Sequence, residues 1–172
     1  MITKAFNLSA VIFFFMVGGA VFAAEPPAPA PAPTDKEALT GLKEIKVIFD
    51  ITTGDAKKLL SRLGLIEETR DSIRQQGVTP RIILAFRGQA GLFIQKNENR
   101  VKLEDLETMA KIQEKVKAMS KDKSYRLAQC AVANRYLKVK NEDTIPEVEV
   151  VGNSFVSMAA YQNKGYAYIP ID

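Results

Sequence analysis

The sequence predicts an α/β domain in which a mainly parallel sheet of about five strands is covered by helices on both faces, as a three-layer α/β/α sandwich. The first observation is that, from Ile45 onward, short β-branched and apolar runs alternate with longer segments of helical periodicity. Strands that alternate with helices pair in parallel, because each helix carries the chain back to the start of the sheet. The second observation is composition: 172 residues, 47% hydrophobic and 26% charged, suffice for one domain with one core.

The first half of the domain contains two expected strands with a long helix between them. Residues 45–51 are rich in β-branched and aromatic side chains, and the turn at residues 52–55 ends this strand. A helix follows until Gln76-Gly77, with an apolar face made of Ala56, Leu59, Leu60, Leu63, Ile66 and Ile73. Residues 81–86 are again apolar and predict a second, buried strand.

The middle of the domain begins with a polar loop at residues 96–100 and a second long helix. The expected apolar side of this helix comprises Leu103, Leu106, Met109, Ala110 and Val116. Residues 125–130 predict a third strand, and a short helix is expected to follow from about Ala131 to Leu137.

The end of the domain repeats the same alternation. Residues 148–151 predict a fourth strand, and Gly152-Asn153-Ser154 turns the chain into a helix. That helix carries the apolar side chains Phe155, Val156, Met158 and Ala159. After Lys164-Gly165, residues 166–169 predict the final strand, which stops before Pro170.

The residues before this domain are expected to direct the chain out of the cytoplasm. Lys4, followed by an uncharged apolar run that ends in Ala23-Ala24, is typical of a signal peptide over residues 1–24 that is cleaved near Ala23 or Ala24. The competing interpretation is an uncleaved membrane anchor, because the run approaches the length that spans a bilayer. Its Ala-rich end favours cleavage, and hence a periplasmic or secreted product that is free of the membrane.

A linker is expected between the signal peptide and the domain. Proline and alanine alternate in the first part of residues 25–41, and proline at this density favours an extended, solvated and disordered segment. The α/β domain is therefore expected to occupy residues 42–172.

Charge and residue types exclude several classes of function. The 24 Lys and Arg residues exceed the 20 Asp and Glu residues too little, and are too interleaved with them, to indicate nucleic-acid binding. The chain has no histidine, which excludes Ser-His-Asp and Cys-His catalysis and every His-based metal site. Its one cysteine, Cys130, excludes an intrachain disulfide and a CxxC pair. We expect no cofactor and no metal.

Several polar residues follow the expected strands. In parallel sheets the ligand crevice lies beyond the carboxyl ends of the strands, so these residues are expected to share one edge. Asp and Ser at such positions are also explained as helix N-caps, and exposed amides at helix starts can hold an anion. The candidate ligand-binding residues at this edge are Gly54, Asp55, Gly88, Asn134, Asn153 and Ser154.

Cys130 is the candidate reactive residue. It stands where the third strand ends and a helix begins, and a helix N-terminus lowers the pKa of a thiol. Arg87, at the tip of the neighbouring strand, is the candidate stabiliser of a Cys130 thiolate. The alternative is that Cys130 is a small buried apolar side chain, as unpaired cysteines often are. Because no base accompanies it, a reactive Cys130 would carry a group rather than turn over a substrate.

Three segments of the chain resemble the DsrE/DsrF-like sulfur-relay family, over about residues 46–169. They are the opening strand 46–50, the strand-end cysteine segment 128–134, and the ending 161–169 with its Gly-Tyr-Ala-Tyr-Ile. The chain departs from the family pattern at Ala131, where Gly is common, and at Arg87, where His is common. The resemblance implies a flavodoxin-like sandwich, a homotrimer or homohexamer, and sulfur carried as a persulfide on the strand-end cysteine.

Two functions follow as expectations. The first is a periplasmic DsrE-like protein that accepts or relays sulfur as a persulfide on Cys130, within a homo-oligomer and between donor and acceptor proteins. The alternative is a non-catalytic binding or assembly module that holds a small anionic ligand at the strand carboxyl edge, with Cys130 inert. Phe155, Met158 and Tyr161 are expected to contribute to the contact between copies.

Overall fold

The structure, a computed structural model, describes residues 33–172, so the expected signal peptide and most of the expected linker lie outside the described residues. The strands and helices are, in chain order, β1 (Glu44–Ile51), α1 (Ala56–Gln75), β2 (Thr79–Phe86), α2 (Leu106–Ser120), β3 (Tyr125–Cys130), α3 (Ala131–Leu137), β4 (Glu149–Val151), α4 (Ser154–Asn163) and β5 (Ala167–Ile171). Short 3₁₀ helices occupy Gly88–Ile94, Leu103–Asp105 and Asn141–Asp143. Within residues 33–172, no helix combines the length and the apolar character that crossing a membrane requires.

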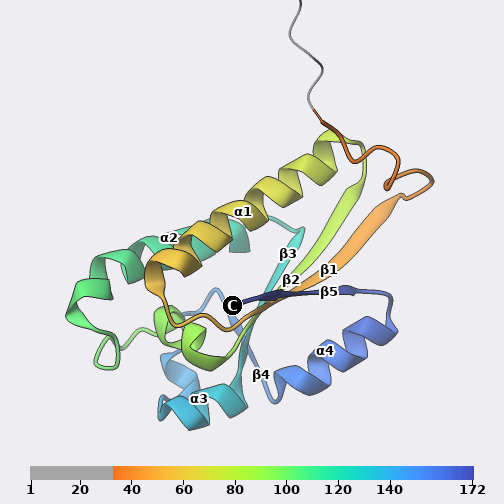
Figure 1. The fold of residues 1–172 in the computed structure, drawn as a ribbon. Helices are drawn as coiled ribbons and strands as arrows, with labels where there is room; N and C mark the ends of the chain where they lie inside the picture. The colour runs from red at the N-terminus through yellow and green to blue at the C-terminus, as the bar shows by residue number, and fades with distance from the viewer. Residues whose placement is uncertain (1–32) are drawn as a thin grey trace, which may run out of the picture. The chain divides into compact units, whose positions relative to one another are not determined.

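The five strands form one sheet in the order β4-β3-β2-β1-β5, and every pairing is parallel (Figure 1). The expected parallel sheet between helices is thus confirmed. The layers are those of flavodoxin-like proteins, whereas flavodoxin itself has the strand order 2-1-3-4-5. Because all strands run the same way, their carboxyl ends meet at a single edge of the sheet.

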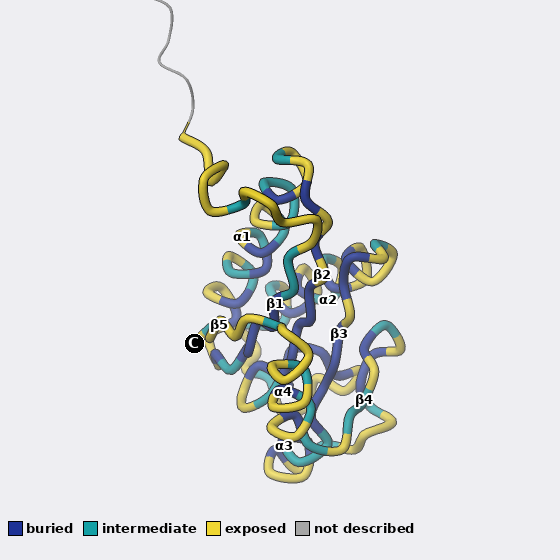
Figure 2. Tube along the Cα trace, turned by 90° about the vertical axis from the view of Figure 1, so that its right-hand side faces the viewer, coloured by how far each residue is buried: buried dark blue, intermediate teal, exposed yellow. Residues whose placement is uncertain are grey.

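Both faces of the sheet are covered. On one face, Val47, Phe49 and Ile51 of β1 pack with side chains of α1 and α2, and on the other face Ile48 packs near Met158 of α4. In Figure 2 the strands β1, β2 and β3 are mostly buried, whereas β5 and much of α4 are exposed. Strands that are buried on both faces need apolar residues at successive positions, which explains the unbroken run Val47-Ile48-Phe49 in the sequence.

The apolar face of α2 differs from the expected one at its start. Leu103 is 83% exposed and Ala110 is also exposed, while Met109, Ile112 and Val116 form the buried face. Leu103 lies in a 3₁₀ turn before the helix, which begins only at Leu106. A 3₁₀ turn has three residues per turn, so Leu103 falls out of phase with the apolar face that follows.

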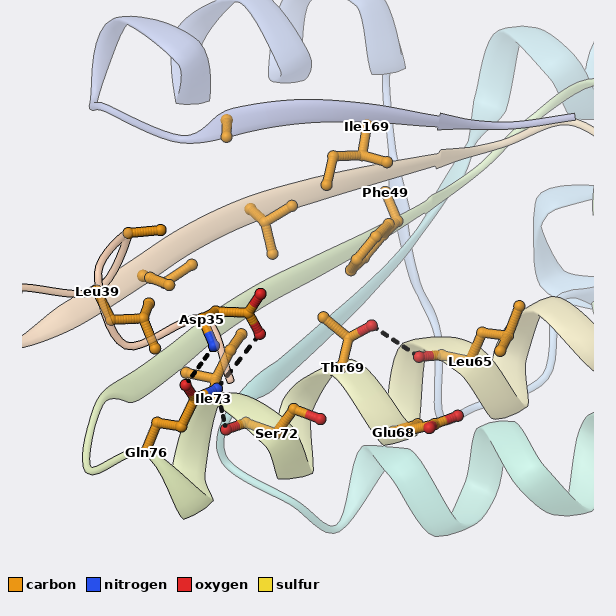
Figure 3. Close-up of a pocket in the computed structure, with 14 residues that line it drawn as sticks. Asp35, Leu39, Phe49, Leu65, Glu68, Thr69, Ser72, Ile73, Gln76 and Ile169 are labelled. Atoms are coloured by element: carbon orange, nitrogen blue, oxygen red, sulfur yellow. Dashed lines mark hydrogen bonds between the residues drawn. The ribbon is translucent and has the colours of Figure 1, made fainter. Parts of the chain in front are cut away.

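The compact unit begins at Asp35, earlier than the expected start at Leu42. The backbone N–H of Asp35 donates to Oε1 of Gln76 at 2.9 Å, where α1 ends (Figure 3). Leu39 lines a cavity beside α1 together with Ile73. Residues 35–41 therefore belong to the folded unit, because they bind the end of α1.

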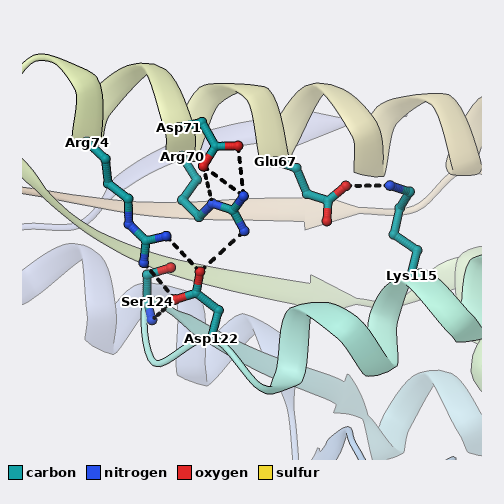
Figure 4. Close-up of polar contacts among 7 residues, drawn as sticks. All are labelled: Glu67, Arg70, Asp71, Arg74, Lys115, Asp122 and Ser124. Carbon is teal, nitrogen blue, oxygen red and sulfur yellow. Dashed lines mark hydrogen bonds and ion pairs between the residues drawn. The ribbon is translucent and has the colours of Figure 1, made fainter.

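A cluster of charged side chains joins α1 to the end of α2 (Figure 4). Asp122 accepts hydrogen bonds from Arg74 at 2.7 and 2.9 Å and from Arg70 at 3.3 Å. Glu67 and Lys115 form a second pair between the two helices. Hydrogen bonding from Arg74 holds the pKa of Asp122 far below its usual value. The cluster stands before β3 begins, at the edge of the sheet opposite to Cys130.

Candidate functional site

A cavity of about 730 Å³, larger than the one around Cys130, is not the candidate site. It lies beside α1 and over β1 and β5, with a lining that includes Phe49, Leu65 and Ile169 (Figure 3). It contains no cysteine, and the side-chain hydroxyl of Thr69 donates to the backbone of α1. A second cavity, of about 390 Å³, contains Cys130. Chemistry rather than volume therefore selects the Cys130 cavity.

The Cys130 cavity lies at the carboxyl edge of the sheet, between the ends of β2 and β3. Its lining comes from the segment after β2, the end of β3, helix α3 and the start of α4, and comprises Arg87, Gly88, Gln89, Cys130, Val132, Ala133, Tyr136, Leu137, Asn153, Ser154 and Phe155. In parallel sheets, ligand crevices lie beyond the carboxyl ends of the strands, which is where this cavity is found.

Cys130 is buried, but hydrogen-bond donors surround its sulfur. The side chain is 4% exposed, and its Sγ accepts a hydrogen bond from the backbone N–H of Ser154 at 3.3 Å. Burial raises the pKa of the Cys130 thiol, but the hydroxyl and amide of Ser154 and the amides of Ala133 and Val132 together lower that pKa below its usual value. Amides at a helix start are free to do this because they have no partner within the helix. The site thus favours the thiolate, which is the nucleophilic form.

Arg87 lines the same cavity, but its guanidinium is held by Asp50 at the end of β1. Nε and Nη2 of Arg87 donate to the two carboxylate oxygens of Asp50, each at 2.6 Å. Tyr168 of β5 also donates to Asp50, at 2.6 Å, and the Arg87 guanidinium lies 5.0 Å from the ring centroid of Phe155. Within residues 33–172, no hydrogen bond links Arg87 to Cys130. Arg87 therefore lines the cavity, but its positive charge is paired with the carboxylate of Asp50.

The structure brings only some of the expected ligand-binding residues to Cys130. Gly88, Asn153 and Ser154 line the cavity, whereas Gly54, Asp55 and Asn134 lie outside its lining. Asp55 is the N-cap of α1, since its carboxylate accepts the N–H of Lys58 at 2.9 Å. Asn153 likewise caps α4 by accepting the N–H of Phe155 at 3.0 Å. The capping interpretation thus explains both of these side chains.

Two of the expected glycines, Gly54 and Gly88, are needed because a larger residue would not fit the local backbone. A Cβ on Gly54 would lie 2.8 Å from Cβ of Gln89, so only glycine permits the two loops to approach this closely. Gly88 has φ +54 and stands against the carbonyl oxygen of Thr52. Glycine adopts this left-handed conformation without strain. Both glycines therefore shape the carboxyl edge of the sheet.

A network of buried amides behind Cys130 was missed at the sequence level. Nε2 of Gln129 donates to Oδ1 of Asn134 at 2.6 Å, and Nε2 of Gln95 donates to the same oxygen at 3.4 Å. A Cβ on Gly91 would lie 2.5 Å from Nε2 of Gln129. The network joins β3 to α3, so Asn134 positions α3. A polar Gln129 directly before Cys130, in an otherwise buried strand, was the available signal.

The three residues expected at the contact between copies differ in exposure. Phe155 is 63% exposed, but Met158 is buried in the smaller core and Tyr161 packs against that core. The expectation was therefore wrong for Met158. Ser154 and Met158 are four residues apart and share the buried face of α4, whereas Phe155 and Val156 point away from the sheet.

Comparisons with known proteins agree with this architecture. The model of the DsrE/DsrF-like family matches residues 46–171, which include all five strands and Cys130. An uncharacterized protein of Aquifex aeolicus (strain VF5) is 25% identical over 126 residues, which are 73% of this chain and 56% of that protein. The chain thus spans about half the length of this curated relative.

A solved structure shares the fold. The protein of unknown function MTH1491 from Methanobacterium thermoautotrophicum matches with a TM-score of 0.57 and 16% sequence identity. The match covers 73% of this chain and 98% of that one.

Proposed function

Because the chain belongs to the DsrE/DsrF-like family, we propose that it is an exported sulfur carrier that holds sulfur as a persulfide on Cys130. The observation that carries the proposal is the hydrogen bonding at Sγ. The sulfur ends a strand, forms part of the lining of a cavity and accepts the Ser154 N–H, in surroundings that lower the pKa of the thiol.

The chemistry that we propose is an exchange of one sulfur atom. The Cys130 thiolate attacks the outer sulfur of a persulfide donor R–S–SH. A new S–S bond forms on Cys130, the S–S bond of the donor breaks, and R–S⁻ leaves with the electron pair and takes a proton from water. With a single cysteine in the chain, no second thiol can convert the product into an internal disulfide. The persulfide therefore persists until an external acceptor thiol removes the sulfur.

The proposal includes export and self-assembly. The apolar run after Lys4 supports export with cleavage near Ala23 or Ala24, and thus a periplasmic or secreted product. Helix α4 supports a homotrimer or homohexamer, because none of its ten residues is charged while Phe155 and Val156 are exposed. Exposed apolar patches of this kind mark protein contacts. Donor and acceptor proteins would supply and remove the sulfur.

Mass spectrometry of the intact protein tests the proposal. After incubation with cysteine persulfide, the wild type is expected to gain the mass of one sulfur atom, and Cys130→Ala none. As a matched control, the variant Cys130→Ala/Ala110→Cys moves the thiol to an exposed position on α2, outside the cavity and outside α4, where it should be modified much more slowly. A wild-type thiol that reacts only after unfolding would show that Cys130 is a core residue, and would contradict the proposal.

A further inference from the structure

The walls of the Cys130 cavity are mostly carbon. Helix α3 contributes Val132, Ala133 and Leu137 to the lining. Two aromatic rings, Tyr136 of α3 and Phe155 of α4, complete it and are 80% and 63% exposed. Aromatic side chains that line a cavity while exposed are available to a ligand. The volume of about 390 Å³ falls within the range of about 300–1,000 Å³ that is usual for small-molecule sites.

The charge in this lining is paired. Arg87 is the one Lys, Arg, Asp or Glu residue among the side chains that line the cavity. Its Nε and Nη2 are bound to Asp50, which is 1% exposed, and Phe155 lies over the guanidinium. An anion that entered the cavity would lose water against carbon walls without meeting an unpaired positive charge. The cavity therefore disfavours anionic ligands.

Two of the remaining polar groups of the lining serve the helix start and the sulfur. Oδ1 of Asn153 accepts the N–H of Phe155 as the cap of α4. The N–H of Ser154 donates to Sγ of Cys130. Gln89 adds an amide and Tyr136 a hydroxyl, and the rest of the side-chain lining is the apolar surface of α3 and Phe155.

We infer that Cys130 exchanges sulfur with a small, uncharged thiol or persulfide whose apolar alkyl or aryl body packs against Phe155 and α3. This inference rests on the proposed function and names its substrate class. In the persulfide R–S–SH, R is hydrophobic, and the atoms balance as in the exchange above: Cys130 gains the outer sulfur and R–S⁻ leaves and takes a proton from water. In delivery, the thiolate R–S⁻ attacks the outer sulfur of the Cys130 persulfide, and the Cys130 thiolate leaves.

A series of methanethiosulfonates that differ only in the transferred group tests this selectivity on the full chain. The groups are benzyl, methyl, the anionic 2-sulfonatoethyl and the cationic 2-(trimethylammonio)ethyl. In each reaction the Cys130 thiolate attacks the divalent sulfur that bears the transferred group. A mixed disulfide forms, and methanesulfinate leaves with the electron pair of the broken S–S bond. Dividing the rate with folded protein by the rate with urea-unfolded protein removes the intrinsic reactivity of each reagent, and the single cysteine makes each rate unambiguous.

We expect the benzyl ratio to exceed both charged ratios by about tenfold, which corresponds to about 1.4 kcal/mol. Phe155→Ala should reduce the benzyl advantage by roughly threefold or more, because the ring that the benzyl group contacts is lost. Leu103→Ala removes another exposed apolar side chain, outside the cavity, and should leave all four ratios unchanged.

Two results would overturn the inference alone. An anionic ratio equal to the benzyl ratio or above it would mean that Arg87 attracts anions despite Asp50, and four equal ratios would mean that the cavity does not select. A thiol that reacts with none of the reagents in the folded state would overturn the proposed function as well. If the benzyl reagent is preferred but Cys130 does not retain sulfur from cysteine persulfide, the proposed sulfur-carrier function is wrong, while the preference of the cavity for apolar groups stands.

Discussion

Hydrogen-bond donors distinguish Cys130 from an ordinary buried cysteine. The amide of Ser154 reaches its sulfur from the start of α4, and the amides of Val132 and Ala133 act from the start of α3. Two helix starts therefore meet at one thiol. The position of Cys130 at the end of a strand, and that of Ser154 at the same edge of the sheet, were predictable from the residue pattern. The hydrogen bond between them was not, because Ser154 is 24 residues away along the chain.

The pH dependence of alkylation tests this environment. The rate of reaction with iodoacetamide rises as the thiolate forms, and for Cys130 the inflection should lie below that of a reference thiol, at about 8.5. Ser154→Ala should move the inflection upward, because the hydroxyl that lowers the pKa of Cys130 is removed while the amide remains. Ser157→Ala, on the same helix, serves as the control and should leave it unchanged. A wild-type inflection at or above the reference would refute the account of the site.

The cluster around Asp50 shows where residue-level inference from the sequence fails. Asp50 lies next to the end of β1, and a carboxylate at such a position is consistent with a strand end in water. Its partners are Arg87, directly after β2, and Tyr168 of β5, which is 118 residues away along the chain. The sequence therefore suggests Arg87 as the stabiliser of a Cys130 thiolate, because the carboxylate that pairs with it cannot be identified from the pattern.

At the scale of elements, α3 depends on its neighbours. It has seven residues, and a helix of this length is not stable alone. The buried side chain of Asn134 binds it to Gln129 of β3, one residue before Cys130. The amides of Val132 and Ala133, which lower the pKa of the thiol together with Ser154, therefore belong to a helix that this side-chain hydrogen bond fixes to the sheet.

Asn134→Leu should weaken both the fold and the site. Losing the hydrogen bonds of a buried amide, while Gln129 stays unpaired, should lower the free energy of unfolding by about 2 kcal/mol. The inflection for alkylation of Cys130 should also move upward, since the start of α3 is no longer fixed. Urea denaturation and the alkylation profile measure the two effects. Arg135→Ala, on the exposed side of α3, is the control and should change neither measurement. An unchanged alkylation profile in Asn134→Leu would show that the buried amide network does not influence the pKa of Cys130.

The contact between α1 and α2 gives a prediction about acid stability. Hydrogen bonding to Arg74 lowers the pKa of Asp122 in the folded state, so its ionised form stabilises the fold above the unfolded pKa of about 3.9, and that stability is lost as the pH falls toward the lower folded value. Asp122→Asn should lower the free energy of unfolding at pH 7 by about 1 kcal/mol, a small value because Arg74 is 44% exposed. In urea titrations the difference from wild type should narrow between about pH 4 and pH 2. If the difference in the free energy of unfolding between wild type and Asp122→Asn stays constant from about pH 4 to about pH 2, the ionised form of Asp122 does not stabilise the fold as described.

The order and type of the strands and long helices were predictable from periodicity, since the apolar runs are clear and each is bounded by turn residues. The 3₁₀ helix Gly88–Ile94 was not, because its glycines are typical of a loop, yet it packs Phe93 and Ile94 into the main core. Residues 35–41 were also assigned to the linker, because their attachment to Gln76 at the end of α1 leaves no periodic pattern.

At the scale of the whole molecule, the edge strand β5 limits how copies can meet. The carbonyl of Ile171 accepts the N–H of Thr52, so the backbone of Ile171 faces β1 and that of Pro170 faces outward. Proline offers no N–H there, which disfavours the addition of another strand at this edge. Copies are therefore expected to meet through side chains, and α4 presents the uncharged face for this purpose.

Val156→Glu is expected to dissociate the oligomer, because it places a charge in the centre of that face. Light scattering at micromolar concentration should show a trimer or hexamer for the wild type and smaller species for this variant. Leu103→Glu introduces the same charge at another exposed apolar position, before α2, and should leave the assembly intact. A monomeric wild type would exclude self-assembly.

The state of Cys130 in protein isolated from its native host tests the central claim most directly. Alkylation at the moment of lysis, followed by mass spectrometry of the peptide that contains Cys130, distinguishes a thiol from a persulfide. The account predicts a fraction of Cys130 that carries one additional sulfur atom between the cysteine and the alkyl group, and a reductant should remove that sulfur together with the alkyl group. Cys130 found only as an unmodified thiol, and alkylated only after the protein has been unfolded, would contradict it.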